Sequence, residues 1–247
     1  MGSPKQLAIT LAMALCVMSV FRVAAVTIGV ASLVLVFIAA TWYLSPRRPW
    51  PCKAYVVSIK DGPRDRGEVA HRLSNIKFDF YDAVDGRAAD IPPNFNPELK
   101  PGERGCAMSH INLWHHIHSQ NPQGHVLILE DDVRLDDDFN QQLVWIMQHL
   151  DQTIDIVFLG HCIEKEGRVW RSAERFALRQ SVTPRCTHAY LLTPRGLQKL
   201  VEWSKSSNVD EPIDEELANL VRSGALQSLS VFPPIAHQTG TASTINR

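Results

Sequence analysis

Short apolar segments and longer amphipathic segments follow one another along most of the chain. Short segments rich in apolar residues predict strands, and apolar residues repeated every three or four positions predict helices. The predicted strands cover residues 54–59, 78–81, 126–129, 154–159, 189–192 and 229–232. The predicted helices cover residues 64–73, 103–118, 138–150, 194–203 and 211–221. Strands that alternate with helices indicate an α/β fold with a mostly parallel sheet.

The first fifty residues have a different pattern. Between Leu7 and Leu44 only Arg22 carries a charge. Residues 23–44 are long enough to cross a bilayer, which takes about 20 apolar residues in a helix. Trp42 and Tyr43 lie at the end of this stretch, where aromatic side chains favour the membrane interface. The pattern predicts one transmembrane helix. A cleaved signal peptide and a second span within residues 7–21 are the alternatives.

The predicted organisation follows from this contrast. Proline-rich residues after the apolar stretch are typical of a short connecting stem, and the rest of the chain is long enough for one domain with a sizeable core. The expected segments are an apolar N-terminal segment at 1–22, a transmembrane anchor at 23–44, a stem at 45–52 and one domain at 53–247.

Net charge and cysteines narrow the class of protein. A formal net charge of −1 argues against a nucleic-acid binder held by bulk positive charge. Four of the five cysteines lie in the predicted domain: Cys52, Cys106, Cys162 and Cys186. They suit two disulfides in a secretory compartment, with three possible connectivities, or four reduced thiols. No Cys-x-x-Cys pair occurs, which argues against a zinc ribbon or a redox motif.

The predicted strand at 126–129 ends in three carboxylates, Glu130, Asp131 and Asp132. In open α/β sheets ligands bind beyond the carboxyl ends of the strands. In an extended backbone Glu130 and Asp132 point to one face and Asp131 to the other. Two converging carboxylates predict a hard-oxygen site for Mg²⁺ or Mn²⁺, with nucleotide phosphates as natural co-ligands. The alternative is a solvated acidic turn that caps the following helix.

Histidines gather on the predicted helix at 103–118. His115 and His118 are three residues apart and could share a metal, which leaves a metal-dependent hydrolase open. The His-Glu-x-x-His motif is absent, and ordinary packed or surface histidines are the simpler interpretation. The chain also lacks the nucleophile elbow, the phosphate loop and the dinucleotide-binding glycine motif, which disfavours a serine hydrolase, a kinase and a Rossmann dehydrogenase.

Six segments resemble, in the same order, the motifs of glycosyltransferase family 25. They are AYVVSIKDGPRDR (54–66), GERGCAMSHINLWHHI (102–117), HVLILEDDV (125–133), THAYLLTPRGLQKLV (187–201), PIDEEL (212–217) and PPIAHQTGTASTI (233–245). That family includes bacterial lipooligosaccharide galactosyltransferases and collagen hydroxylysine galactosyltransferases. The resemblance covers residues 53–245 and implies a nucleotide-sugar-binding, GT-A-like fold related to the Rossmann fold.

The resemblance also implies an activity. The expected reaction moves a hexose, often galactose from UDP-galactose, to a hydroxyl group of a glycan or protein, with inversion and with Mn²⁺ or Mg²⁺ as cofactor. A membrane anchor then implies a single-pass protein of the Golgi or endoplasmic reticulum with a lumenal catalytic domain. A catalytically inactive relative that acts as a cell-surface adhesion or binding module is the alternative. The acceptor stays open.

Family positions carry over to eight residues of this chain. Asp214 is the expected catalytic base or a donor contact, and His110 a second catalytic candidate. The expected substrate-binding residues are Ser58, Arg66 and Ser109, and the expected metal ligands are Glu130, Asp132 and His237. Simpler roles compete with these. Asp214 can stabilise a helix N-terminus, Arg66 can be a solvated helix residue, and His110 can be a packed core residue.

Overall fold

The computed structural model describes residues 51–240. The predicted N-terminal segment at 1–22, the predicted anchor at 23–44 and most of the predicted stem lie outside these residues. Within residues 51–240, no helix combines the length and the apolar character needed to cross a membrane.

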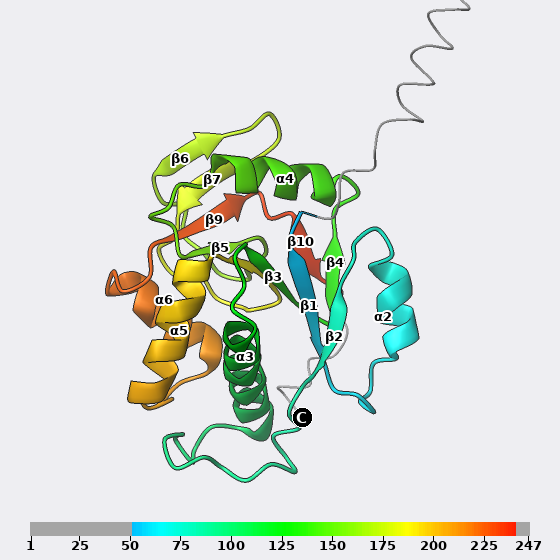
Figure 1. Ribbon diagram of the computed structural model, residues 1–247, viewed down its shortest axis with the longest axis vertical. Helices are drawn as coiled ribbons and strands as arrows, with labels where there is room; N and C mark the ends of the chain where they lie inside the picture. The colour runs from blue at the N-terminus through cyan, green and yellow to red at the C-terminus, as the bar shows by residue number, and fades with distance from the viewer. Residues whose placement is uncertain (1–50, 241–247) are drawn as a thin grey trace, which may run out of the picture. The chain divides into compact units, whose positions relative to one another are not determined.

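An eight-stranded sheet forms the centre of the described domain (Figure 1). Its strand order is β2-β1-β3-β8-β5-β9-β7-β6. A separate two-stranded sheet pairs β4 with β10. The strands are β1 (Lys53–Ser58), β2 (Asp79–Asp82), β3 (Val126–Glu130), β4 (Val133–Leu135), β5 (Ile156–Phe158), β6 (Val169–Ser172), β7 (Ala177–Gln180), β8 (Ala189–Leu192), β9 (Ser228–Phe232) and β10 (Ala236–Gln238).

The prediction of a mostly parallel sheet in an α/β fold is confirmed, with a refinement. Strands β2, β1, β3, β5, β9 and β6 run in one direction, whereas β8 and β7 run in the other. Because β8 lies between β3 and β5, it divides the parallel strands into two groups. The sheet is therefore mixed. Strand β3 belongs to a parallel group of three strands, β2, β1 and β3.

Helices cover both faces of the sheet (Figure 1). They are α2 (Arg66–Arg72), α3 (Pro101–Ser119), α4 (Phe139–His149), α5 (Pro194–Ser206) and α6 (Ile213–Arg222). Apolar residues of α2 and α4 pack with one face of the central strands, and those of α3, α5 and α6 pack with the other. On β3, Leu127 belongs to the first cluster and Ile128 to the second. Burial on both faces explains why the central strands are continuously apolar.

The sequence patterns did not predict four strands. Strands β6 and β7 form a hairpin-like pair at one edge of the sheet, and β4 and β10 form the small separate sheet. Each has only three or four residues, and their sequences include arginine, glutamine and serine. The pairing of β10 with β4 is important for the site, because it brings residues near the C-terminus beside the acidic turn.

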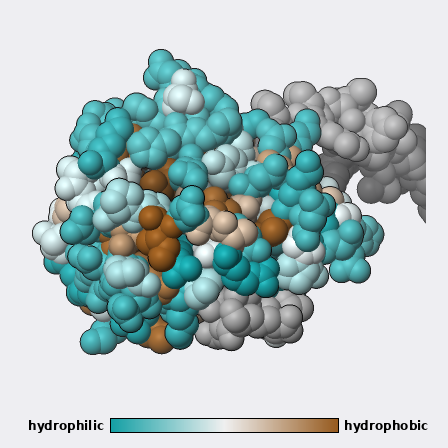
Figure 2. All heavy atoms as spheres, turned by 90° about the horizontal axis from the view of Figure 1, so that it is seen from below, coloured by the Kyte–Doolittle hydropathy of each residue, from teal (hydrophilic) through white to brown (hydrophobic). Residues whose placement is uncertain are grey.

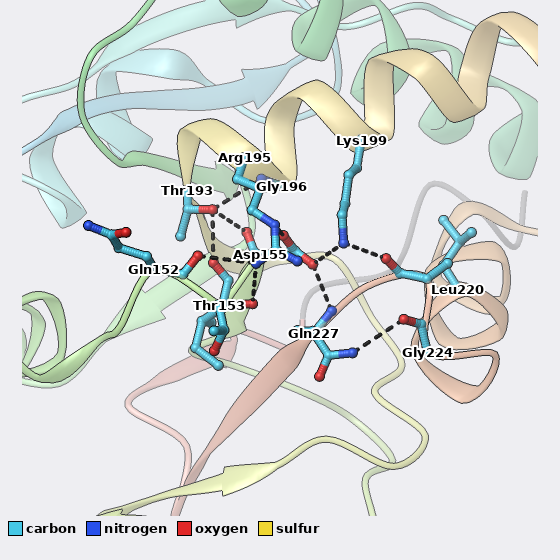
Figure 3. A network of polar contacts seen from close by, with 12 residues as sticks. Gln152, Thr153, Asp155, Thr193, Arg195, Gly196, Lys199, Leu220, Gly224 and Gln227 are labelled. Atoms are coloured by element: carbon cyan, nitrogen blue, oxygen red, sulfur yellow. Dashed lines mark hydrogen bonds and ion pairs between the residues drawn. The ribbon is translucent and has the colours of Figure 1, made fainter.

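A buried carboxylate joins α5 to the edge of the sheet that lies opposite the acidic turn (Figure 3). Asp155, just before β5, has no exposed surface. It accepts hydrogen bonds from Lys199 Nζ at 2.7 Å and from the backbone N–H of Gln227 at 2.8 Å. Arg195 Nε lies 3.2 Å from its other oxygen. Thr193 caps the same helix by accepting a hydrogen bond from the Gly196 N–H.

We expect Asp155→Asn to lower the free energy of unfolding by about 2 kcal/mol, because the buried side chain loses its charge-assisted hydrogen bonds to Lys199 and to the Gln227 N–H. Urea denaturation of the full chain measures this. Arg195→Gln is the control. Its side chain is 44% exposed, so losing its ion pair should cost below about 1 kcal/mol. Equal unfolding midpoints for Asp155→Asn and the unmodified chain would show that this network does not stabilise the fold.

Candidate active site

A cavity of about 770 Å³ opens beyond the carboxyl ends of β1, β2 and β3. Its walls come from the segment after β1, one side of α2, the loop after β2, the N-terminal half of α3, the acidic turn and the end of β10. Seen from this edge, the surface of the molecule is predominantly hydrophilic, with a few apolar side chains between the polar ones (Figure 2). The position agrees with the rule that ligands bind beyond the carboxyl ends of parallel strands.

The acidic turn is built differently from the sequence prediction. Strand β3 ends at Glu130, and Asp131 and Asp132 belong to a turn. Arg64 Nη1 lies 2.8 Å from Asp131 Oδ1, and its Nη2 lies 3.4 Å from Asp132 Oδ2. The prediction that Asp131 faces away from Asp132 is therefore wrong, because the alternation of an extended strand stops one residue earlier. The guanidinium group of Arg64 supplies positive charge to both carboxylates.

Arg64 does not fully compensate the buried charge. Burial raises the pKa of Asp131, and burial together with the charge of Glu130 raises the pKa of Asp132 to about 6. Asp132 Oδ1 is buried and has no hydrogen-bond partner within residues 51–240. An oxygen that is both charged and unpaired in a cavity is suited to bind a further cation.

Glu130 faces a different set of partners. Its Oε1 lies 3.3 Å from His110 Nε2 and accepts a hydrogen bond from the Thr187 hydroxyl at 2.5 Å. Burial alone would raise the pKa of Glu130, but the hydrogen bonds and attraction of His110 and Thr187 lower it. His110 Nδ1 lies 2.8 Å from the Tyr190 hydroxyl, which also accepts a hydrogen bond from Trp114 Nε1. This chain of buried contacts fixes the ring of His110.

A second, smaller cavity of about 250 Å³ adjoins the first. Cys106, Glu130 and Gln238 line both cavities, and Asp214 lines the smaller one. Asp214 lies in the first turn of α6, where its Oδ2 accepts a hydrogen bond from the Cys186 N–H at 3.0 Å. Two ligands bound one in each cavity would therefore meet beside Glu130.

The other two acids of this turn have separate partners. Glu216 is buried and accepts hydrogen bonds from the backbone N–H groups of Asp210 and Glu211. Glu215 forms an ion pair with Arg185. Asp214 thus faces the cavity, while Glu216 satisfies the backbone before the helix.

One disulfide forms next to this cavity. It links Cys162 to Cys186, whereas Cys52 and Cys106 are free. The sequence left open two disulfides or none, and the observed state is neither of these. The disulfide joins the segment after β5 to the segment before β8. It thereby holds the Cys186 N–H against Asp214 and the adjacent Thr187 against Glu130.

The two predicted substrate-binding serines line the large cavity and are buried. Ser58 lies beside Asp131 and lowers its pKa. Ser109 uses its hydroxyl within the protein. It donates a hydrogen bond to the Gly105 carbonyl and accepts one from the Val84 N–H. Ser109 therefore holds the loop after β2 against α3.

The structure does not bring Arg66 or His237 to the cavity. Arg66 donates hydrogen bonds to the Ser58 carbonyl and to the Asp82 carboxylate at the ends of β1 and β2. His237 Nε2 lies 3.0 Å from Asp136 Oδ1. The cavity is lined instead by Arg64, Arg72, Gln238 and Thr239, which the sequence analysis missed. The sequence could have suggested Arg64, because it stands two residues before Arg66 in the same family motif. Only the start of α2 at Arg66 decides which arginine faces the cavity.

The histidine pair considered for a hydrolase does not form a site. His115 Nε2 lies 2.9 Å from the Ser204 hydroxyl, and His118 is exposed. Neither belongs to a cluster of potential metal ligands within the described part of the chain.

The sequence of the chain is similar to those of known glycosyltransferases. The family model described as "Glycosyltransferase family 25 (LPS biosynthesis protein)" matches residues 52–217. Procollagen galactosyltransferase 1 of Danio rerio is 28% identical over 168 residues, which cover 60% of this chain and 27% of that protein. A putative glycosyltransferase of Haemophilus influenzae is 25% identical over 174 residues, which cover 65% of this chain and 60% of that protein.

A third relative has a different description. The "Probable inactive glycosyltransferase 25 family member 3" of Rattus norvegicus is 28% identical over 128 residues, which cover 44% of this chain and 22% of that protein. The chain thus spans less than a third of the length of this relative and of the Danio rerio protein.

Proposed function

The chain belongs to glycosyltransferase family 25, and from this premise we propose that it is an active hexosyltransferase. The proposed reaction moves galactose from UDP-galactose to a hydroxyl group of a glycan or protein acceptor, with inversion. The observation that carries the proposal is the pair of adjoining cavities. One contains the acidic turn and three arginines, Arg64, Arg72 and Arg87. The other contains Asp214, and Glu130 borders both.

The larger cavity has the properties expected of a nucleotide-sugar site. Its volume of about 770 Å³ lies in the range of small-molecule sites. Arg64 and Arg72 lie in its wall, and guanidinium groups bind phosphate oxygens through charge-assisted hydrogen bonds. Arg72 donates to the carbonyls of Asp131 and Val133, whereas Arg64 contacts the carboxylates of the acidic turn themselves. Arg64 is therefore the candidate for the diphosphate that lies nearest to the proposed cation.

The acidic turn fits a divalent cation. The unpaired oxygen of Asp132 and the raised pKa of its carboxyl group both indicate negative charge that Arg64 leaves uncompensated. Mg²⁺ and Mn²⁺ prefer such carboxylate oxygens. Asp132 would hold the cation, with Glu130 as the second candidate. When bound, the cation would stabilise the charge that develops on the leaving diphosphate.

In the smaller cavity Asp214 would act as general base. A transfer in one displacement with inversion requires a carboxylate that takes the proton of the acceptor hydroxyl as the oxygen attacks the anomeric carbon. The Cys186 N–H holds one oxygen of Asp214, so the other oxygen would receive the proton. His110 would act indirectly, because it keeps Glu130 in position between the cavities.

An inactive binding module is the second candidate, since relatives bear the description inactive. An adhesive domain has no need for buried, mutually repelling carboxylates, and this favours the enzyme. Hydrolysis of a panel of nucleotide sugars by the full chain, with and without Mn²⁺, tests the proposal. Turnover of UDP-galactose that depends on the metal supports it. Absence of turnover with the whole panel would favour the binding module.

We expect Arg64→Gln to weaken binding of UDP-galactose by about 10- to 100-fold, because a charged hydrogen bond to phosphate is lost. Arg66→Gln is a matched control, since Arg66 stands two residues later but binds Asp82 outside the cavity. Isothermal titration calorimetry with the nucleotide sugar compares the two variants. Equal losses for both would contradict the assignment of Arg64 to the donor.

We further propose a single-pass protein of the Golgi or endoplasmic reticulum with a lumenal catalytic domain. The apolar stretch at 23–44 supports the anchor, and the Cys162–Cys186 disulfide is typical of an oxidising compartment. We expect the domain to resist added protease in sealed microsomes and to be digested once detergent opens them. Digestion without detergent would place the domain on the cytosolic side.

A further inference from the structure

Three chemically different side chains converge where the two cavities meet. The sulfur of Cys106, a ring nitrogen of His110 and a carboxylate oxygen of Glu130 all lie within 4.8 Å of one another. We propose that these three groups bind a thiophilic divalent cation, best Zn²⁺, at a site that shares only Glu130 with the one proposed at Asp132. This binding does not depend on transferase activity.

The fold places the three ligands on a packed helix and a central strand. Cys106 and His110 are four residues apart on α3, so they lie one above the other on one face of the helix. Glu130 is the last residue of β3, which is paired on both sides within the sheet. Helix and strand are packed together through a shared apolar cluster. The spacing of the ligands is therefore set by the core and not by a loop.

The ligand chemistry favours zinc over Mg²⁺ or Mn²⁺. Zn²⁺ binds thiolate, imidazole and carboxylate at about 2.0–2.3 Å in a tetrahedron, which places ligand atoms roughly 3.3–3.9 Å apart. Ligand atoms within 4.8 Å of one another reach this arrangement by small side-chain movements. Cys106 and Glu130 border both cavities. A fourth coordination position therefore faces open space, where water or a ligand can bind.

Groups around the cluster orient its ligands as in known metal sites. Metal-bound histidines usually hydrogen bond through their second ring nitrogen to a fixed partner. His110 does so, because its Nδ1 lies 2.8 Å from the hydroxyl of Tyr190, which Trp114 Nε1 also holds. All three rings are fully buried, and Nε2 is the nitrogen that faces Glu130. With a metal at Nε2, Nδ1 carries the proton and donates it to the Tyr190 oxygen.

A second cluster in the described part of the chain, formed by Cys162, Cys186 and His188, is not equivalent. Its two sulfurs are bonded to each other in the disulfide, so they provide no thiolates. While the disulfide is intact, Cys106 is therefore the cysteine that can provide a thiolate to either cluster. This difference permits a clean test, provided that no thiol reductant is present.

Cobalt is a suitable probe, because Co²⁺ takes the place of Zn²⁺ and shows a near-ultraviolet charge-transfer band when thiolate binds it. We expect the purified full chain, with its disulfide intact, to develop this band at one Co²⁺ per chain and to lose it when Zn²⁺ is added. Absence of the band in the unmodified chain would overturn the proposal. The readout needs no sugar donor, so its failure is separate from failure of the proposed transferase function.

Variants identify the sulfur. Cys106→Ser should abolish the band, whereas Cys52→Ser, which removes the other free thiol of the described domain, should keep it. His110→Gln retains the thiol and should weaken Co²⁺ binding by more than about tenfold. Circular dichroism checks that each variant is folded, and Cys106→Ala replaces Cys106→Ser if the latter is not. A band that persists without Cys106, or undiminished affinity in His110→Gln, would contradict the assignment.

Discussion

Replacing Asp132 with asparagine should lower kcat for sugar transfer on the order of 10³-fold. The change keeps the size of the side chain but removes the charge that would hold the cation, and Lewis-acid stabilisation of a leaving diphosphate is worth several kcal/mol. Initial rates of galactose transfer, or of UDP-galactose hydrolysis if the acceptor is unknown, measure the effect across a range of Mn²⁺ concentrations. Wild-type turnover in the variant would contradict the metal assignment.

Asp131→Asn is the matched control, and the structure changes what it should show. Asp131 holds Arg64 at 2.8 Å, whereas Asp132 has a free, buried oxygen. Asp131→Asn should therefore loosen Arg64 and raise KM for the donor, with a smaller effect on kcat. If both variants lose kcat equally and keep KM, the two carboxylates share one role.

Stability gives a second, independent readout for Asp132→Asn. Burial and the charge of Glu130 raise the pKa of Asp132 to about 6, from an ordinary value of 3.8. A raised pKa means that the folded chain disfavours the charged carboxylate at neutral pH, so a neutral side chain removes a cost. We expect the Tm of the metal-free variant to equal or exceed that of the unmodified chain, while activity is lost.

The central elements of the fold could be predicted because their signals are local. Strands buried on both faces, such as β3 and β8, are continuous apolar runs, and α5 has a clear apolar face and starts at proline. Strands β6 and β10 could not be predicted. Their residues are largely polar, and they are strands only because β7 and β4 pair with them. For β10 that partner, β4, lies far away in the sequence, so no local pattern can reveal the pairing.

The site shows the same limit at the level of single residues. The position of the acidic turn beyond β3 followed from the sequence, but the orientation of its side chains did not, because the strand ends one residue too early for alternation. Likewise, one turn of α2 decides that Arg64 and not Arg66 faces the cavity. His237 was assigned from its place in a motif, yet the register of β10 against β4 directs its neighbours Gln238 and Thr239 to the cavity instead.

Replacing Asp214 with asparagine should lower kcat by about 10²- to 10⁴-fold, the loss expected when a general base is removed. The structure makes this substitution conservative. Asp214 Oδ2 accepts a hydrogen bond from the Cys186 N–H, and an asparagine carbonyl can accept the same bond. The turn of α6 and the adjoining disulfide should therefore keep their geometry, so that only basicity is lost.

Glu215→Gln separates a catalytic role of Asp214 from a general effect of charge at the start of α6. Glu215 is the next residue in the same turn and borders the same cavity, but its carboxylate is engaged by Arg185. The Glu215→Gln variant should therefore retain most of the transferase activity. Donor affinity, measured by calorimetry on Asp214→Asn, then decides the role of Asp214. Unchanged affinity with a collapsed kcat identifies the base. If affinity falls together with the rate, Asp214 binds donor or metal, and Glu215 and His110 become the next candidates for the base.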